Sequence, residues 1–285
     1  MQKISGKEVS QSLIKRLKAL ELPDKILAAI LIGEDPTSLS FLRQKEKMAK
    51  ELGVDFRLYK LSDKLTNDDL RGEVGKISKQ SKVSGVIVQL PLPPAVNKYY
   101  VSNAIPREKD VDVLGERALG AFYNDRNDVI PPAVGVVEEI LKTVNYSPHS
   151  EAGELKTKKV AVLGLGKLVG KPISVWLTGK CRELYLLDKE SDLEGIGQVD
   201  LVITGVGKAG LVNPKMLKIG AGVIDFGYYY FPDGRLSGDF DPNPEKELEK
   251  LSFYTPTPGG TGPILVAKLF ENFYTLNPVA QLRLD

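Results

Sequence analysis

The first ninety residues alternate between amphipathic stretches and short apolar runs. Val9, Leu13, Leu17 and Leu20 recur at helical spacing, and the apolar run over 26–32 that follows them predicts a buried strand ending at Gly33. The same order recurs twice, with predicted helices over 37–52, which Gly53 is placed to cap, and over 65–78, and with predicted strands over 54–58 and 85–90. Alternating helices and strands predict a parallel sheet, whose ligand crevice lies beyond the carboxyl ends of its strands.

A second block of the same kind begins where the apolar run Val160–Leu163 leads directly into Gly164. Further strands are predicted over 183–187, 200–204, 222–225 and 253–254, which makes this half a Rossmann-type domain. A closing helix is predicted over 266–276, and we expect it to return to the first domain because the dinucleotide domain is already complete. The predicted fold is therefore α/β with two domains: an N-terminal parallel-sheet domain over 1–132, completed by 264–285, and a Rossmann-type dinucleotide-binding domain over 133–263.

Composition narrows the class of protein. In 285 residues, 42% are hydrophobic and 27% charged, and 39 basic against 37 acidic residues leave a net charge of +2, too balanced for a nucleic-acid partner. One cysteine, Cys181, and one histidine, His149, provide neither a disulfide nor a metal-ligand cluster, and His149 lies in a polar stretch that predicts a surface position. The polar N-terminus and the lack of a long apolar run argue against a signal peptide or a membrane partner, so we expect a cytoplasmic protein without a metal.

The segment from Gly164 to Pro172 has the context of a dinucleotide-binding turn. Glycines between a strand and a helix let the backbone approach a pyrophosphate, which the helix N-terminus then binds. The spacing, G-x-G-x-x-x-G, is one residue longer than the standard fingerprint, so a simple strand-to-helix turn is an alternative. Asp188 follows the next predicted strand, where a carboxylate accepts hydrogen bonds from a ribose, and glycines also follow two later strands, at Gly205, Gly207 and Gly227. Dinucleotide binding is therefore the better interpretation.

Three polar features of the first domain are candidates for chemistry. Phe41 and Lys45 are four residues apart on one predicted helix and share a face, although most helix lysines are only solvated charges. Gln89 ends an apolar strand, where a buried amide is either a structural hydrogen bonder or a site residue. Asp110 and Asp112 belong to the segment 109–112, for which a solvated turn is the alternative. None of these features decides the function alone.

Taken in order, these features resemble the bifunctional methylenetetrahydrofolate dehydrogenase/cyclohydrolase family over nearly the whole chain. Residues 36–45 are similar to the family's helix with Tyr and Lys four apart, Val88-Gln89-Leu90-Pro91-Leu92-Pro93 matches its V-Q-L-P-L-P stretch, and Lys109-Asp110-Val111-Asp112 matches K-D-V-D. The segment 255–263, Thr-Pro-Thr-Pro-Gly-Gly-Thr-Gly-Pro, is similar to the family's T-P-V-P-G-G-V-G-P loop and is the most specific match. Residues 164–172 match the family's G-R-S-x-x-V-G-x-P in part.

The resemblance implies two α/β domains with a folate cleft between them and two consecutive reactions. Hydride passes from 5,10-methylenetetrahydrofolate to a nicotinamide, and water then opens the methenyl cation to 10-formyltetrahydrofolate. Lys45 is implied as the proton-transfer group, Gln89 as the residue that orients it, Asp112 as the pterin anchor and Phe41 as a stacking surface. The other implied substrate-binding residues are Val88, Leu90, Pro258, Gly259, Gly260, Gly262 and Pro263. The implied cofactor-binding residues are Gly164, Leu165, Gly166, Val169, Gly170, Asp188, Gly205, Gly207, Gly227 and Tyr228.

Departures from the family pattern refine these expectations. Phe41 replaces a tyrosine and loses its hydroxyl, Val113 stands where the family has glycine, and the loop over 131–135 differs from the family's P-C-T-P-x-G. Leu165 replaces the arginine that faces the 2′-phosphate in NADP-using members, and Asp188 lies near their serine contact. Because a carboxylate repels a phosphate but binds a free 2′-hydroxyl, we predict NAD over NADP.

Two alternatives stay open at this point. The first is a dehydrogenase-only relative, in which hydration is slow because Phe41 cannot assist Lys45. The second is a non-catalytic dinucleotide- or folate-binding protein, although such a protein has no need of the Lys45 and Gln89 pair. A homodimer is implied by the family resemblance alone.

Overall fold

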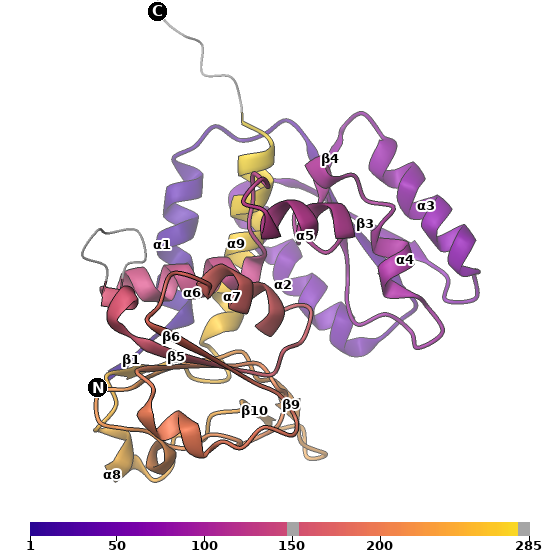
Figure 1. Cartoon of the computed structure of the whole chain (residues 1–285). Coiled ribbons are helices and arrows are strands. Elements are labelled where there is room, and N and C mark those ends of the chain that lie inside the picture. Colours follow the sequence, from indigo (N-terminus) through magenta and orange to yellow (C-terminus); the bar gives the residue numbers. More distant parts are fainter. Residues whose placement is uncertain (147–153, 279–285) are drawn as a thin grey trace, which may run out of the picture. The chain divides into compact units, whose positions relative to one another are not determined.

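The chain folds into two compact units in a computed structural model that describes residues 1–146 and 154–278. His149 lies outside the described residues. The Lys45 unit comprises Leu13–Pro132 and Val266–Asp285, and the Gly164 unit comprises Met1–Ser12 and Ala133–Leu265. Figure 1 shows both units coloured along the chain, with many of their elements labelled. The helices are α1 (Gly6–Lys18), α2 (Pro36–Leu52), α3 (Asn67–Lys79), α4 (Lys98–Ser102), α5 (Glu116–Tyr123), α6 (Pro132–Thr143), α7 (Gly170–Leu177), α8 (Glu245–Leu248) and α9 (Thr261–Leu276).

The Lys45 unit is built on a three-stranded parallel sheet. Its order is β3 (Asp55–Leu61), β2 (Ile26–Ile32) and β4 (Val83–Val88), so β2 is the central strand and every one of its residues is buried. That burial on both faces explains why β2 is a continuous apolar run instead of an alternating one. Before α2, the Asp35 side chain accepts the backbone N–H of Ser38 at 2.7 Å, and after it Gly53 adopts φ 77° to cap the last turn.

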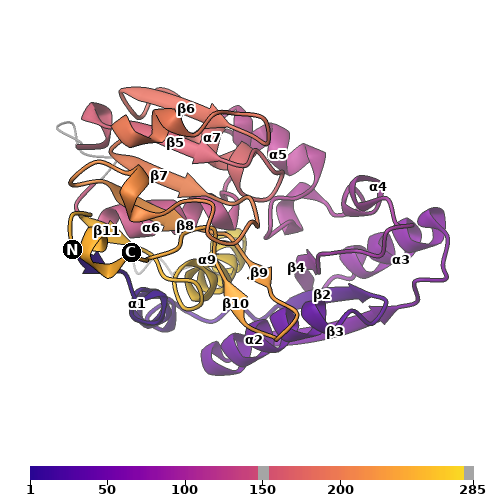
Figure 2. The same ribbon diagram turned by 90° about the horizontal axis from the view of Figure 1, so that it is seen from below.

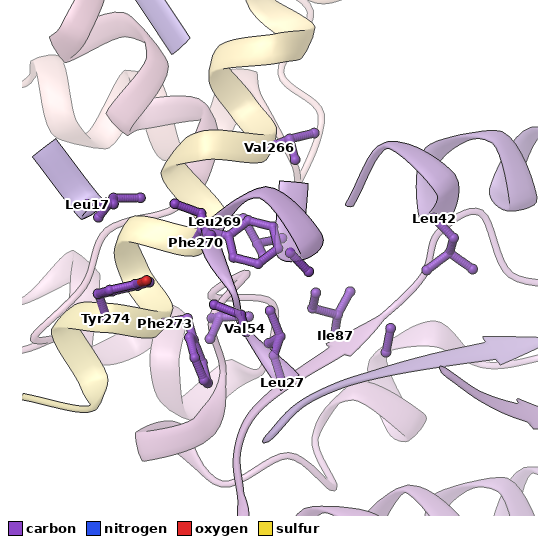
Figure 3. Packing of buried hydrophobic residues seen from close by; sticks show 14 of the residues in the cluster. Leu17, Leu27, Leu42, Val54, Ile87, Val266, Leu269, Phe270, Phe273 and Tyr274 are labelled. Atoms are coloured by element: carbon purple, nitrogen blue, oxygen red, sulfur yellow. The ribbon is translucent and has the colours of Figure 1, made fainter. Parts of the chain in front are cut away.

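Helix α9 completes the core of the Lys45 unit. Its apolar face contributes Val266, Leu269, Phe270, Phe273 and Tyr274 to a buried cluster that also contains residues of β2 and β4 (Figure 3). The aromatic ring of Phe273 packs so closely on Gly85 that a Cβ there would lie 2.6 Å from it. The prediction that the C-terminal helix returns to the first domain is confirmed.

The Gly164 unit has a six-stranded sheet in which all neighbouring strands are parallel. Its order is β1 (Gln2–Lys3), β11 (Phe253–Tyr254), β8 (Gly222–Asp225), β7 (Leu201–Thr204), β5 (Lys159–Leu163) and β6 (Glu183–Leu187). Figure 2 shows β6, β5 and β7 side by side. The chain passes from β5 to β6 on one side and then crosses to β7 on the other side of β5. The topological switch point of this sheet therefore lies at the carboxyl ends of β5 and β7. A separate hairpin pairs β9 (Tyr229–Tyr230) with β10 (Leu236–Ser237).

The α/β fold with a Rossmann-type half is as predicted, but some element ends differ. Helix α9 begins at Thr261 and not at Val266, because Gly262 and Pro263 are tolerated in a first turn, where backbone N–H groups need no helical partner. Helix α1 spans 6–18 and not 9–20, and β3 extends to Leu61. The predicted first domain included residues 1–12, whereas the structure groups them with the Gly164 unit, since β1 pairs with β11 and Gly6 donates its N–H to the Gly259 carbonyl at 2.9 Å.

No helix in the described ranges is both long and apolar enough to cross a membrane.

Candidate functional site

Lys45 and Gln89 meet inside the Lys45 unit. Lys45 lies on α2 and is only 8% exposed, and its Nζ donates to Gln89 Oε1 at 2.8 Å. Gln89 follows β4 directly, and its Nε2 donates to the Leu90 carbonyl at 2.5 Å, which leaves Oε1 facing the amine. The lysine is therefore not one of the solvated helix charges, and the buried amide that ends the apolar strand holds it.

Asp112 reaches the same place because its segment runs beside β4. An isolated parallel bridge joins Val86 to Asp110, and Asp112, two residues further on, is close enough to Lys45 for the two charges to interact. Burial lowers the pKa of Lys45, and the nearby Asp112 carboxylate opposes this by raising it. Burial likewise raises the pKa of Asp112, and Lys45 lowers it. The structure thus brings together the three residues that the resemblance implies for catalysis.

Asp110 is a feature that the sequence did not reveal. Its carboxylate is 1% exposed and accepts the backbone N–H groups of Leu114, at 3.0 Å, and of Gly115, at 2.7 Å. The segment 110–115 therefore winds around this carboxylate, and the alternative of a solvated turn is wrong. The available signal was the segment Lys109-Asp110-Val111-Asp112 itself, which carries a second aspartate two residues before Asp112.

The ionisation of Asp110 gives a prediction for stability. Burial raises its pKa to about 6, although the N–H groups of Gly115 and Leu114 act in the opposite direction. Because the folded pKa lies above the unfolded value, this group contributes stability that is complete below about pH 4 and is lost as the pH rises through about 6. We expect Asp110→Asn to cost about 2 kcal/mol more at pH 4 than at pH 7, as measured by urea unfolding at both pH values. An equal cost at the two pH values would contradict this assignment.

The remaining predicted folate residues of this unit lie on the same elements. Phe41 is half-buried one turn before Lys45 on α2, Val88 is the buried last residue of β4, and Leu90 is half-buried after it. Val113 has φ 54°, a left-handed conformation that is uncommon for a β-branched residue. The family's glycine at this position is explained by that backbone, which this chain retains with valine, buried at 1% exposure.

The glycine turn of the other unit lies at its topological switch point. Gly164 has φ 82°, and an added Cβ at Gly170 would lie 1.8 Å from the Gly164 carbonyl oxygen, so both glycines are required by the turn itself. Gly166 is different, because it is exposed and an added Cβ would meet no atom within 4 Å. A glycine that the turn does not need is expected where another molecule approaches the backbone. Val169 is the residue from which α7 begins, and its side chain packs against Gly205, the first residue after β7.

Asp188 and Leu165 lie at the same edge of the sheet. Leu163 pairs with Leu187, and Gly164 donates its N–H to the Leu187 carbonyl at 2.8 Å, which places exposed Asp188 beside the start of the turn. Leu165 is half-buried. After β7, Gly207 has φ 78°, while Gly227 is buried and Tyr228 is exposed after β8. Together these residues line the carboxyl ends of β5, β6, β7 and β8, where open α/β sheets bind ligands.

The Pro/Gly-rich segment follows β11 in the Gly164 unit. Pro258 and Gly259 are exposed, and Gly260 is buried where a Cβ would lie 2.4 Å from the Pro256 carbonyl oxygen. Gly262 is exposed in the first turn of α9 with no atom within 4 Å of an added Cβ, and Pro263 is half-buried beside it. In the described ranges, no group of three or more histidine, cysteine or carboxylate side chains is arranged to hold a metal ion.

Two family models match the chain. One, described as the catalytic domain of tetrahydrofolate dehydrogenase/cyclohydrolase, matches residues 4–112. The other, described as the NAD(P)-binding domain of the same enzymes, matches residues 133–280.

Individual proteins and structures agree with these models. The chain is 33% identical to the bifunctional protein FolD of Helicobacter acinonychis, over 86% of this chain and 82% of that protein. It is 32% identical to the FolD protein of Streptococcus thermophilus, over 95% of this chain and 93% of the relative. The crystal structure of the Campylobacter jejuni bifunctional enzyme superposes with a TM-score of 0.85 at 28% identity, covering 97% of each chain. The Trypanosoma brucei enzyme, solved with NADP and an inhibitor, superposes with a TM-score of 0.84 at 28% identity, covering 96% of each chain.

Proposed function

The chain belongs to the tetrahydrofolate dehydrogenase/cyclohydrolase family, and on that premise we propose that it oxidises 5,10-methylenetetrahydrofolate and hydrolyses the methenyl product to 10-formyltetrahydrofolate. The observation that carries this proposal is the buried hydrogen bond from Lys45 Nζ to Gln89 Oε1 beside Asp112. A chain that only bound a dinucleotide or a folate would need the pterin anchor but not this buried lysine-amide pair.

In the dehydrogenase step, the main contribution of the protein is to position the folate. When bound, the dinucleotide accepts hydride from the methylene carbon, and the folate nitrogens stabilise the resulting cation, so little covalent help is required. Asp112 would bind the amino-pyrimidine N–H groups of the pterin, and Phe41 would stack on the ring system. The residues at the switch point of the Gly164 unit fit a dinucleotide, because Gly166 leaves its backbone open to a pyrophosphate.

The hydrolysis step depends on Lys45. Water adds to the methenyl carbon and loses one proton to give a hydroxyl group. The bond from that carbon to N5 then breaks as N5 gains a proton and the hydroxyl loses its own to form the formyl C=O, so one proton in total is released. Burial lowers the pKa of Lys45, so its amine gives up a proton more readily than that of a solvated lysine, and in this proposal it accepts the proton of the attacking water and returns one to N5. Gln89 keeps the amine in place, since its Nε2 is occupied by the Leu90 carbonyl.

The dehydrogenase-only alternative rests on Phe41, which lacks the hydroxyl of the family's tyrosine. The test follows loss of 5,10-methenyltetrahydrofolate with and without the protein, in the absence of a dinucleotide. We expect loss well above the uncatalysed rate, because Lys45, Gln89 and Asp112 are all in place. A rate equal to the uncatalysed one, together with a working dehydrogenase, would favour the alternative.

We also propose that NAD is preferred over NADP. Exposed Asp188 lies beside the glycine turn and Leu165 lacks the positive charge that a 2′-phosphate would need, so the 2′-hydroxyl of NAD is the better partner. Lys167 and Lys189 lie nearby in the sequence and could offset part of this repulsion. Comparison of kcat/KM for the two cofactors tests the proposal, and a clear NADP preference would contradict it.

Two glycine substitutions separate cofactor binding from the turn's own structure. Gly166→Ala is expected to leave the melting temperature unchanged and to weaken dinucleotide binding roughly 10- to 100-fold, because the methyl group occupies space that only the ligand uses. Gly170→Ala is expected to lower the melting temperature, since its Cβ would overlap the Gly164 carbonyl oxygen.

A matched control is Gly195→Ala, because Gly195 is also exposed with no atom within 4 Å of an added Cβ, and it lies outside the turn. Calorimetric titration with NADH and thermal unfolding measure both quantities. Unchanged NADH affinity in Gly166→Ala would contradict the assignment of the turn.

Finally, we propose a homodimer, supported by the family membership. Light scattering coupled to gel filtration tests it, with twice the mass of one chain expected and a single-chain mass contradicting it. The cytoplasmic location stays a prediction from the sequence.

A further inference from the structure

Two aspartates of the Gly164 unit are fully buried and have no role in the reactions described above. Asp225 is the last residue of β8, Asp239 follows β10, and both are 0% exposed. Among the described residues, neither forms an ion pair with a lysine or arginine. Because a buried carboxylate without a cation costs several kcal/mol unless it is hydrogen-bonded, the groups that face these two side chains show what they stabilise.

Asp239 binds the segment after β7. Its Oδ2 accepts the Thr204 hydroxyl at 2.7 Å and the Val206 N–H at 2.6 Å, and its Oδ1 accepts the Lys208 N–H at 2.7 Å. These donors enclose Gly205 and Gly207, both of which are predicted to bind the cofactor. One carboxylate therefore fixes the shape of this loop from within the fold.

Asp225 binds the loop after β8 and the segment that carries Asp239. Its Oδ1 accepts the Gly227 N–H at 2.6 Å and the Asp239 N–H at 3.3 Å, and its Oδ2 accepts the Phe240 N–H at 3.1 Å. Asp239 lies so close to the loop after β8 that a Cβ on Gly227 would be 2.3 Å from Asp239 Cγ. Gly227 is thus required by the close approach of Asp239.

The Pro/Gly-rich segment is attached to the same aspartate through threonine hydroxyls. Thr257 Oγ1 donates to Asp225 Oδ2 at 3.2 Å, and Thr261 Oγ1 donates to the Asp225 carbonyl at 2.9 Å. The similar family loop, T-P-V-P-G-G-V-G-P, has valine at both positions. Two departures from the family pattern therefore converge on one residue.

From these contacts we propose that Asp225 and Asp239 are positioning residues that hold the loops after β7 and β8 and the 255–261 segment as one piece, with Thr257 and Thr261 as an additional attachment in this chain. The proposal rests on the proposed function, because the loops after β7 and β8 carry predicted cofactor residues and the 255–261 segment carries predicted folate residues. Neither aspartate contacts a substrate in this scheme. Asp239 acts on dinucleotide affinity through the loop after β7, and the threonines act on the alignment of the folate segment with the cofactor loops.

The first test compares Asp239→Asn with Thr204→Val in the full chain. The asparagine places an NH₂ group against N–H donors of the loop, so the Kd for NADH is expected to rise roughly 10- to 100-fold. Methenyltetrahydrofolate hydrolysis without a dinucleotide is expected to stay within about twofold, since it does not use this loop. The hydroxyl of Thr204, the last residue of β7, donates to the same carboxylate, and Thr204→Val removes this hydrogen bond. We expect a smaller rise in the Kd for NADH than in Asp239→Asn.

The second test uses the double variant Thr257→Val with Thr261→Val, which restores the family residues without a change in side-chain size. We expect kcat for hydride transfer to fall about 2- to 10-fold while the Kd for NADH stays within about twofold. This variant also keeps the proposal testable if Asp239→Asn does not fold.

Three results would overturn the proposal: NADH affinity unchanged in Asp239→Asn, an equal loss of affinity in Thr204→Val, or hydride transfer unchanged in the threonine variant. If Asp239→Asn lost methenyltetrahydrofolate hydrolysis in proportion to its loss of thermal stability, the role of Asp239 would be purely structural. That result would also overturn the proposal. If the unaltered protein forms no NADH from methylenetetrahydrofolate, the proposed function fails, whereas titration of Asp239→Asn with NADH still decides the positioning role.

Discussion

Replacement of Lys45 by methionine is expected to slow hydrolysis of 5,10-methenyltetrahydrofolate about 100- to 10,000-fold, the usual contribution of a positioned proton-transfer group. Methionine keeps the length and the apolar stem of the lysine side chain but cannot accept a proton. Because the amine donates to buried Gln89 Oε1 and interacts with the Asp112 carboxylate, its removal leaves both without this partner, and the melting temperature is expected to fall. Loss of methenyl-folate absorbance, corrected for the uncatalysed rate, measures the effect.

Lys47→Met on the same helix is the matched control, since Lys47 is exposed where Lys45 is buried. The control is expected to hydrolyse methenyl-folate at the unaltered rate. If both variants lost the same fraction of activity, or if Lys45→Met kept full activity, Lys45 would not be the proton-transfer group.

Replacement of Asp188 by serine is expected to shift cofactor choice toward NADP. The ratio of kcat/KM with NAD to kcat/KM with NADP is expected to fall about 10- to 100-fold, because the carboxylate that repels a 2′-phosphate is gone and serine can donate a hydrogen bond to it. Steady-state kinetics with both cofactors at equal concentrations give the ratio. Asp188 is exposed at the end of β6, so the substitution is not expected to destabilise the fold.

Glu190→Ser controls for the change of net charge, since Glu190 is also exposed and lies two residues further along the chain. It is expected to change the ratio much less. An equal shift in both variants would mean that the overall field, and not a contact at Asp188, sets the preference.

Much of the fold was predictable because its central strands, such as β2, β7 and β8, are buried on both faces. Such strands form continuous apolar runs, as in β2, and the glycines that end them mark the turns. The short strand β1 was missed because two exposed residues carry no periodic signal, and they are held by pairing with β11, whose paired residues lie 251 positions further along the chain.

The candidate site was only partly predictable for a related reason. Helical spacing shows that Phe41 and Lys45 share a face, but burial of the lysine depends on β4 and on the segment beside it, which come from distant parts of the sequence. Asp110, Asp225 and Asp239 were missed as loop-binding carboxylates because their partners are backbone N–H groups, which no sequence pattern identifies. Gln89 and Asp225 are both polar residues at the end of an apolar strand. This signal marks Gln89 as a candidate site residue in the sequence analysis, but it was not applied to Asp225.

The most direct test of the account is a coupled assay in which the full chain receives 5,10-methylenetetrahydrofolate with either NAD or NADP, and both the reduced cofactor and 10-formyltetrahydrofolate are measured. We expect reduced cofactor with NAD in preference to NADP, and conversion of the methenyl product to 10-formyltetrahydrofolate faster than the uncatalysed rate. Binding of the dinucleotide and the folate with no reduced cofactor formed from either NAD or NADP would contradict it.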